Sequence, residues 1–294
     1  MEKKLTMDKL VNLCKARGFV FQGSEIYGGF ANTWDFGPVG VELKNNIKRA
    51  WWKKFVQEDP STYGVDAAIL MNPRVWEASG HVQSFGDPKM DCKNCKTRHR
   101  ADTIIENFTK GKVSAEGMSN EEMEKFIEEH DIKCPNCGKR DWTPIRKFNP
   151  MFTTSRNMVG LKIYETYKQK ALNFEESLGL KAENLRFHDH DKLAPYAKAA
   201  CDIQYNFPIG WQELNGIHHR GNWDLSRHSE FSGKTMDYLD PYTNERYIPN
   251  VIEYSIGADR LMLAIMSEAY DEETLENGET RVVMHFLPAI APFK

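Results

Sequence analysis

The segment "NVIEYSIGADRL" (250–261) gathers three side chains that could do chemistry: the carboxylate of Glu253, the hydroxyl of Ser255 and the guanidinium of Arg260. Side chains alternate along a strand, so Glu253 and Ser255 project from one face of it. Arg260 follows Gly257 within one turn of an expected helix. Converging on one cleft, these groups could bind an amine, a metal-bound phosphate, and a phosphate or purine. The alternative is an internal Glu253–Arg260 ion pair that only ties the strand to the helix.

Glu213 in "GWQELNGI" is a second carboxylate on a strand-like run. Two carboxylates on neighbouring strands could hold Mg²⁺ against nucleotide phosphates. A lone exposed glutamate is the simpler interpretation. The segment "HHRGNWDLSRH" (218–228) could stack on bases or contact phosphates, but its composition is more typical of a solvated loop with an anchored tryptophan.

Four of the six cysteines form two C-x-x-C pairs, Cys92 with Cys95 and Cys134 with Cys137. This spacing is close to that of a structural zinc ribbon with a long insert. Four thiolates close a tetrahedral site and leave no position for a substrate, so the expected Zn²⁺ is structural. Unrelated free thiols and C-x-x-C redox chemistry are the alternatives.

The elements around these residues predict an α+β fold. Apolar spacing predicts helices over 41–57 and 161–178, and Ser119 with Glu122 predicts a capping box that opens a short helix. The segment "WDFGPVG" is expected to be turn, and "VDAAILMNP" (65–73) a buried strand. Further strands are expected at 202–207, 210–217, 247–256 and 281–287. This order favours a mostly antiparallel sheet flanked by helices over strict βαβ alternation.

Composition narrows the class of protein. The 294 residues carry a net charge of −3 with a pI near 6.3, which excludes a polyanion binder that works by bulk charge but not a local basic face. No run approaches the roughly 20 apolar residues that span a bilayer. The N-terminus lacks the apolar core of a signal peptide, so a cytoplasmic location without membrane contact is expected.

Several segments, taken in order, resemble the dimeric bacterial type of glycyl-tRNA synthetase. They are "RGFVFQGSEIYGGFANTWDFGPVGVELKNNIKRAWWKKFV", "ILMNPRVWEASGHVQSFGDP", "CKNCKTRHRAD", "CPNCGKRDW", "FPIGWQELNGI" and "YIPNVIEYSIGADRLMLAIMSEAYDEE". The core of the last is similar to motif 3 of class II aminoacyl-tRNA synthetases. The resemblance covers nearly every residue.

The resemblance implies a class II antiparallel sheet of six or seven strands with a zinc-ribbon insertion, and a homodimer formed through motif 1. It implies a glycine–tRNA ligase that makes glycyl-adenylate from glycine and ATP with Mg²⁺, then passes glycine to tRNA(Gly). It also implies site residues, with Arg260 and Glu253 as the catalytic pair. The ATP-binding set is Glu213, Leu214, Gly257, Ala258, Asp259 and Arg260, with Glu213 expected to bind Mg²⁺. The glycine-binding set is Arg100, Glu253, Tyr254, Ser255, Ile256 and Gly257.

The expected organisation has four parts. They are an N-terminal part of the catalytic domain with motif 1 (1–90), the zinc-ribbon insertion (91–147), a C-terminal part with motif 3 (148–280), and the start of a linker (281–294). In the family that linker leads to an anticodon-binding domain, which is not expected within these 294 residues.

One departure bears on activity. The family places motif 2 between "KFNPMFTTSR" and "LKIYETYKQ", whereas here residues 153–160 lead directly into a helix. Loss of the motif 2 arginine removes a preorganised donor of a kind worth on the order of 3–4 kcal/mol, and nothing in the sequence argues that Arg146 or Arg156 replaces it. An impaired ligase is therefore expected. The alternatives are an inactive synthetase-like binding protein, similar to polymerase accessory subunits, and a zinc-ribbon nucleic-acid-binding module.

Overall fold

The computed structural model describes residues 5–30, 33–80, 87–109, 113, 115, 118–148, 161–190, 193–194 and 196–293. The chain divides into two compact units, one of residues 1–68, 155–226 and 236–294 and the other of residues 69–154 and 227–235. Each unit has its own hydrophobic core.

The first unit is built on an antiparallel sheet. Its strands are β6 (Leu185–Asp189), β7 (Ala199–Phe207), β8 (Gly210–Gly221) and β11 (Val251–Ile256), in the order β11-β8-β7-β6. Gly210 has a φ of +100° at the tight β7–β8 turn, a conformation that glycine adopts without strain. Within the described ranges this sheet has four strands, fewer than the six or seven expected.

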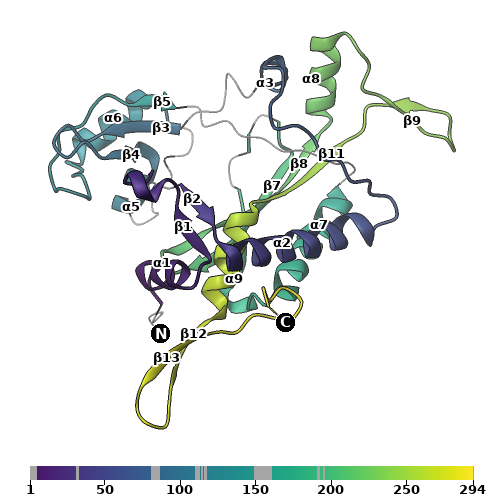
Figure 1. The fold of residues 1–294 in the computed structure, drawn as a ribbon. Coiled ribbons are helices and arrows are strands. Elements are labelled where there is room, and N and C mark those ends of the chain that lie inside the picture. The colour runs from purple at the N-terminus through teal and green to yellow at the C-terminus, as the bar shows by residue number, and fades with distance from the viewer. Residues whose placement is uncertain are drawn as a thin grey trace. The chain divides into compact units, whose positions relative to one another are not determined.

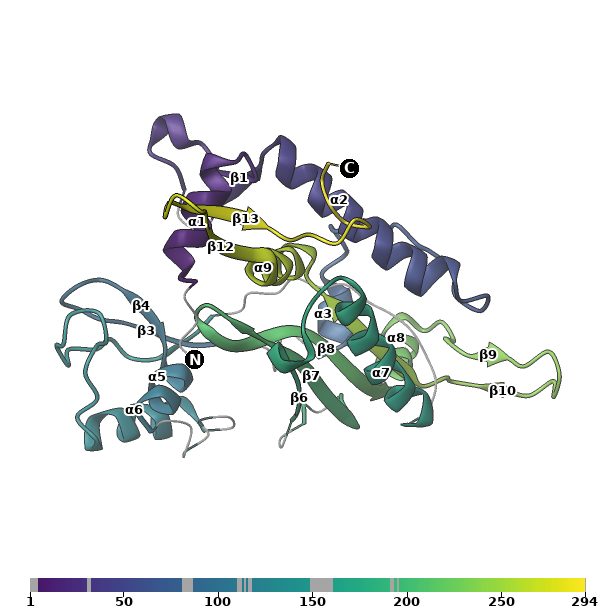
Figure 2. The same cartoon turned by 90° about the horizontal axis from the view of Figure 1, so that it is seen from below.

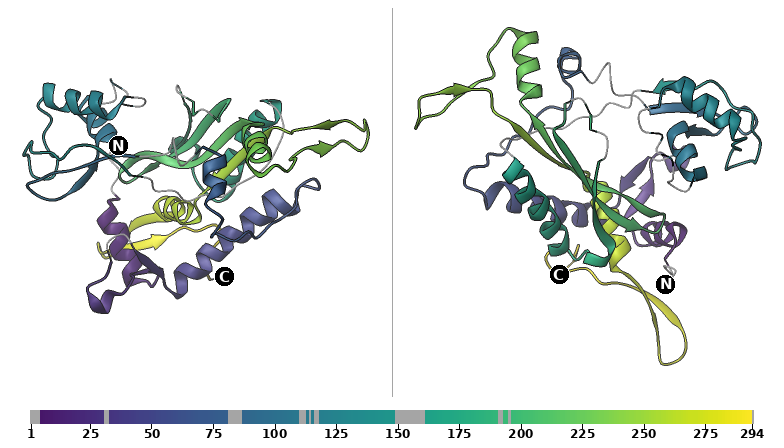
Figure 3. Two further views of the ribbon diagram at one scale, coloured as in Figure 1. Left: turned by 90° about the horizontal axis from the view of Figure 1, so that it is seen from above. Right: turned by 180° about the vertical axis from the view of Figure 1, so that it is seen from behind.

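Two helices cover one face of this sheet. They are α7 (Leu161–Ser177), which packs on β8 and β11, and α9 (Ala258–Ala269), which packs on β7 and β8. Helix α2 (Pro38–Trp52) lies on the outer side of α9, as the two opposite views of Figures 2 and 3 show. The apolar side chains of these helices pack against those of the sheet in one core. The sheet therefore has one buried face, toward the helices, and one open face.

Smaller elements complete the first unit (Figure 1). They are α1 (Met7–Ala16), β1 (Val20–Gln22), η1 (Glu25–Tyr27), β2 (Trp34–Phe36), η2 (Lys53–Gln57), η3 (Ala182–Asn184), α8 (Trp223–Ser232, which continues into the second unit), and the hairpins β9 (Tyr238–Leu239) with β10 (Arg246–Tyr247) and β12 (Tyr270–Thr274) with β13 (Thr280–Met284).

The second unit combines a small sheet with short helices. Strands β3 (Asp87–Asp91), β4 (Arg98–Arg100) and β5 (Arg146–Phe148) pair antiparallel in the order β4-β3-β5. Helices α5 (Ala101–Thr109) and α6 (Asn120–Glu129) contribute to its core, and α3 (Arg74–Ala78) also belongs to this unit. The predicted capping box is confirmed, because Ser119 and Glu122 exchange side-chain and backbone hydrogen bonds at the start of α6.

Most of the predicted elements form, with shifted boundaries. The predicted helices 41–57 and 161–178 correspond to α2 with η2 and to α7. Helix α2 starts earlier than expected, at Pro38, because proline is tolerated in the first helical turn, where its missing N–H costs nothing. Gly40 lets that turn pack directly against the backbone of Phe19. The run 247–256 is divided between β10 and β11 by the segment that contains Pro249.

Three segment predictions were wrong. The segment "WDFGPVG" is mostly not turn, because Trp34–Phe36 form β2 and α2 begins at Pro38. Residues 65–73 form no strand, and Ile69 and Leu70 are 80% and 92% exposed, because this run pairs with none of the described strands. Residues 218–228 are not a loop: His218 to Gly221 end β8, and Trp223 starts α8. None of the helices in the described ranges combines the length and the hydrophobicity that a bilayer crossing requires.

A buried acid lies between α7 and the sheet. Glu175 on α7 is fully buried and accepts a hydrogen bond from the side-chain amide of Asn215 on β8. Tyr254 on β11 presents a buried hydroxyl to the same region. Burial raises the pKa of Glu175 well above its ordinary value of 4.5, opposed by the Asn215 hydrogen bond and reinforced by the Glu176 charge. The folded protein therefore favours the protonated acid.

Replacing Glu175 with glutamine should make unfolding less dependent on pH. A carboxyl with a raised folded-state pKa contributes stability that is fully present below the unfolded pKa of about 4.5 and is lost as the pH rises through the folded pKa. Glutamine stays neutral, so the free energy of unfolding of Glu175→Gln, relative to wild type, should increase with pH across that window and then level off. Urea denaturation at a series of pH values measures this. Glu183→Gln, at an exposed position, is the matched control, and a pH-independent difference for Glu175→Gln would contradict the argument.

Candidate active site and metal site

The open face of the sheet brings together polar groups from three strands. In the antiparallel register Glu253 lies opposite His218 and Ser255 lies opposite Gly216, which in turn lies opposite Asp202 on β7. Residues opposite each other in such a pair project from the same face. Glu253 and Ser255 therefore do share a face, as strand alternation predicts, and they share it with residues of β8 and β7.

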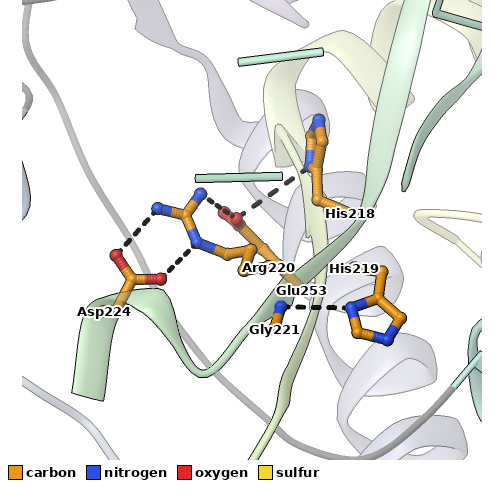
Figure 4. Close-up of polar contacts among 6 residues, drawn as sticks. All are labelled: His218, His219, Arg220, Gly221, Asp224 and Glu253. Carbon is orange, nitrogen blue, oxygen red and sulfur yellow. Dashed lines mark hydrogen bonds and ion pairs between the residues drawn. The ribbon is translucent and has the colours of Figure 1, made fainter. Parts of the chain in front are cut away.

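Arg220 is the partner of Glu253. Its Nη1 donates to Glu253 Oε2 at 2.9 Å and its Nε donates to Asp224 Oδ2 at 2.6 Å, so the guanidinium bridges two carboxylates (Figure 4). The guanidinium carbon also lies 4.1 Å from the ring centre of Tyr196. Burial lowers the pKa of Arg220, but the hydrogen bond to Asp224 and the two carboxylate charges outweigh it and raise that pKa. This largely buried group therefore keeps its charge.

Arg260 contacts a different strand. It lies in the first turn of α9, where its Nη1 donates to the Glu213 carbonyl at 2.9 Å and lies 4.0 Å from Glu213 Oε2. The alternative of a Glu253–Arg260 ion pair is thus wrong within the described part of the chain, because each residue contacts another partner. Both side chains of the Arg260–Glu213 pair are more than half exposed, which leaves them accessible to a ligand. Partial loss of hydration raises the pKa of Glu213, and the Asp202 charge raises it further.

Two histidines complete the polar face. His190 Nε2 lies 2.9 Å from Asp202 Oδ2, and His218 Nδ1 lies 3.9 Å from Glu253 Oε2. Burial lowers the pKa of His218, and this effect exceeds the opposing influence of Glu253 and Asp202. His218 is therefore neutral near pH 7 and leaves the charge of Glu253 to Arg220.

The other predicted ligand-binding residues differ in whether their side chains or only their backbone atoms could contact a ligand. Leu214 is buried, and Tyr254 and Ile256 pack against the core, so these three could reach a ligand only through backbone atoms. Asp259 pairs with Lys44 at 2.5 Å, and Ala258 opens α9.

Gly257 lies between β11 and α9 with a φ of −82°, and a Cβ there would lie 3.7 Å from Arg260 Cβ, an ordinary contact. Neither backbone strain nor the chain's own packing requires glycine at this position.

Arg100 lies in the second compact unit, on β4, where it forms a two-point ion pair with Asp102. Arg146 lies in the same unit, on β5. Arg156 and the segment 153–160 fall outside the described residues.

Sequence reasoning missed Arg220, Asp224, His218, Asp202 and His190. The signal was available for two of them, because His218 and Arg220 continue the alternation from Gly216 along β8. The loop-like composition of 218–228 concealed it. The positions of Asp202 and His190 depend on strand pairing, which the sequence does not state.

The four paired cysteines meet in the second unit. Cys92 and Cys137 sulfurs lie 3.6 Å apart, those of Cys95 and Cys134 lie 3.7 Å apart, and all four lie within 4.8 Å of one another. Thr97 and Asn136 hydrogen bonds lower the pKa of Cys95 to about 5, which favours a thiolate. His99 Nε2 lies 3.5 Å from the Cys134 sulfur. Four convergent sulfurs fit a tetrahedral metal ion.

Known proteins are similar in sequence to this chain over its whole length. The family description "glycyl-tRNA synthetase insertion domain 1" matches residues 112–150. The glycine–tRNA ligase of Caldanaerobacter subterraneus subsp. tengcongensis is 47% identical over 371 residues, which cover 100% of this chain and 80% of that protein. The chain belongs to the glycine–tRNA ligase family. The ligases of Geobacillus kaustophilus and Clostridium acetobutylicum are 46% and 45% identical, over 99% and 100% of this chain and 80% of each relative. These matches confirm the resemblance and favour a ligase over the two non-catalytic alternatives.

The fold agrees with this family. Prolyl-tRNA synthetase of Giardia lamblia, solved in complex with prolyl-adenylate, matches with a TM-score of 0.55 at 13% identity, over 98% of this chain and 56% of that longer chain. This likeness supports the expected class II synthetase fold with its antiparallel sheet and flanking helices.

The relatives contain residues that this chain lacks. The alignment with the first relative spans 371 positions, whereas the chain has 294 residues in all. That residues are missing before α7, where motif 2 is expected, stays a prediction.

Removing the Arg220 guanidinium should destabilise the first unit. Arg220→Gln leaves two largely buried carboxylates without their cation, a loss on the order of 3–5 kcal/mol in the free energy of unfolding for buried pairs. Urea denaturation near pH 7 measures it. Arg246→Gln breaks the exposed Arg246–Asp237 pair and should cost less than about 1 kcal/mol. Equal effects of the two changes would show that Arg220 does not serve as a buried counter-ion.

Proposed function

We propose that this chain is a glycine–tRNA ligase that activates glycine with ATP and Mg²⁺ and transfers the glycyl group to tRNA(Gly). The observation that carries the proposal is the open sheet face on which Glu253 and Ser255 lie, with Arg260 following in the first turn of α9, in a chain 47% identical to a ligase of this activity. An acidic and a hydroxyl group suit an ammonium ion, and a guanidinium suits a nucleotide.

Each side chain has a distinct proposed role. Glu253 and Ser255 hold the glycine ammonium, with Gly257 leaving space for the ligand and the backbones of Tyr254 and Ile256 bordering it. Arg260 lies against ATP, next to the backbone of Leu214, Ala258 and Asp259. Arg100, in the second unit, is proposed as a further arginine on the glycine side.

Arg220 adds a role that the sequence did not indicate. It fixes one oxygen of Glu253, so that the carboxylate keeps one orientation and its other oxygen remains for the ammonium. Asp224 in turn fixes Arg220.

Glu213 is the proposed Mg²⁺ ligand. A half-exposed carboxylate beside an arginine suits a hard cation that keeps most of its waters and also binds phosphates. When bound, Mg²⁺ would neutralise phosphate charge. Glu213 would orient the metal–nucleotide complex, and its raised pKa implies that it binds the ion better as the pH increases.

The four cysteines are proposed to bind Zn²⁺ as a structural ion. The thiols of Cys92, Cys95, Cys134 and Cys137 offer a closed four-sulfur set with no position for a substrate. The domain boundaries at residues 90, 147 and 280 are proposals on the same family basis.

A homodimer is proposed as the working form. Exposed apolar side chains follow α2, among them Tyr63, Val65, Ile69 and Leu70, each at least 71% exposed. Apolar runs of this kind mark interaction surfaces, and the family places motif 1 there. Action in the cytoplasm remains a prediction.

Glycine-dependent exchange of pyrophosphate into ATP tests the proposed reaction. The wild type should catalyse it, at a reduced rate if no other group replaces the motif 2 arginine. Glu253→Gln removes the charge that pairs with the ammonium and should lower kcat/KM for glycine by about 10- to 100-fold, because a hydrogen bond to a charged group contributes about 1.5–3 kcal/mol. Glu279→Gln, on the exposed β12–β13 turn, is the control and should match wild type. Wild-type protein that binds tRNA without any exchange would refute the ligase proposal for this chain.

Zinc content and chelation test the metal proposal. Purified protein should contain about one zinc ion per chain, as four thiolates make one tetrahedral site, and a strong chelator should lower the melting temperature. Cys134→Ser should bind less zinc, whereas Cys14→Ser, at a cysteine buried outside the cluster, should keep full zinc content. Equal zinc content in the two variants would contradict the assignment.

A further inference from the structure

His218 occupies a defined place beside the proposed glycine site. It lies opposite Glu253 in the β8–β11 register, and its Nδ1 is 3.9 Å from Glu253 Oε2. In Figure 4 its ring and the guanidinium of Arg220 flank the same carboxylate. The imidazole therefore borders the group proposed to receive the substrate ammonium.

The ring also extends along β8 over Gly216. A Cβ added to Gly216 would lie 2.7 Å from His218 Cε1, 3.4 Å from its Nδ1 and 3.6 Å from Asp202 Oδ1. Gly216 lies opposite Ser255 in the register. The imidazole thus covers the sheet between the Glu253 and Ser255 positions, and the missing Gly216 side chain makes room for it.

A substrate held at these positions has little space on this side. If Glu253 and Ser255 bind the ammonium, the α-carbon of the amino acid lies one bond further on, next to the imidazole. A hydrogen there is accommodated, whereas a methyl or hydroxymethyl group would contact the ring. Burial keeps the ring neutral, so it does not compete with the ammonium for Glu253.

We propose that His218 is a specificity-determining residue, whose imidazole fills the space that the side chain of alanine or serine would need. This inference rests on the proposed function, because it takes Glu253 and Ser255 as the ammonium site. A binding pocket distinguishes two amino acids that differ by one methyl group only modestly, unless a rigid group occupies the place of that methyl. The inference assigns this steric exclusion to the side chain of His218.

The test compares amino acids in the pyrophosphate exchange assay. His218→Ala should increase kcat/KM for alanine relative to glycine by about tenfold or more, while exchange with glycine persists. His218→Gln, which keeps most of the bulk without an imidazole, should remain selective for glycine. His285→Ala makes the same substitution at an exposed position directly after β13 and should behave like wild type.

Three results would overturn the inference. The first is a His218→Ala variant that uses glycine well and rejects alanine as strongly as wild type does. The second is a variant that loses glycine and alanine exchange in equal proportion, which would indicate a structural role alone. The third is His218→Gln accepting alanine to the same extent as His218→Ala, which would exclude bulk as the cause.

A binding measurement separates this inference from the proposed function. Calorimetry with non-hydrolysable glycyl- and alanyl-adenylate analogues requires no catalysis. If the wild type lacks exchange but binds the glycyl analogue selectively, and His218→Ala loses that selectivity, the catalytic proposal fails and the role of His218 stands. If neither protein distinguishes the analogues, the role of His218 fails.

Discussion

The antiparallel pairing of β8 with β11 sets the geometry on which the rest of the site depends. It places Glu253 opposite His218 and Ser255 opposite Gly216, so that two strands far apart in sequence present one polar face. A shift of one residue would turn every one of these side chains into the core. The register shift falls at the end of the pairing, between Val251 and Ile252, and from Ile252 to Ile256 the two strands pair residue for residue.

Charge on this face is tolerated because it is compensated locally. Arg220 lies between Glu253 and Asp224, and His190 lies against Asp202, so the largely buried acids have basic or neutral partners. The opposite face packs against Glu175 and Asn215 in the apolar core, where burial raises the pKa of the acid. The two faces thus surround carboxyl groups differently: Glu253 on the open face contacts a guanidinium, whereas Glu175 against the closed face lies among apolar side chains and contacts a neutral amide.

The two compact units divide the proposed chemistry. The first carries Glu253, Ser255, Glu213 and Arg260, and the second carries the four cysteines and Arg100. Each unit has a core of its own. In the second unit the cysteine cluster joins the two C-x-x-C segments, and α5 and α6 lie between these segments in the sequence. A metal ion there would stabilise a small core that has few buried side chains to rely on. The family relationship explains why both units occur in one chain, while an alignment of 371 positions with a chain of 294 residues shows that the first relative contains residues that this chain lacks.

The sequence by itself determined the family, the fold class, the helices over 41–57 and 161–178, the capping box and the pairing of the cysteines. These features depend on local spacing or on motifs that are contiguous in the chain, so they can be predicted without knowledge of tertiary contacts. It also placed Glu253 and Ser255 on one strand face and Arg260 in the helix that follows, because all three lie in one short segment. Only the tertiary structure decided their partners: Arg220 instead of Arg260 for Glu253, and the Glu213 carbonyl for Arg260. Strand register decides such pairs, and register depends on which strands meet in the folded sheet.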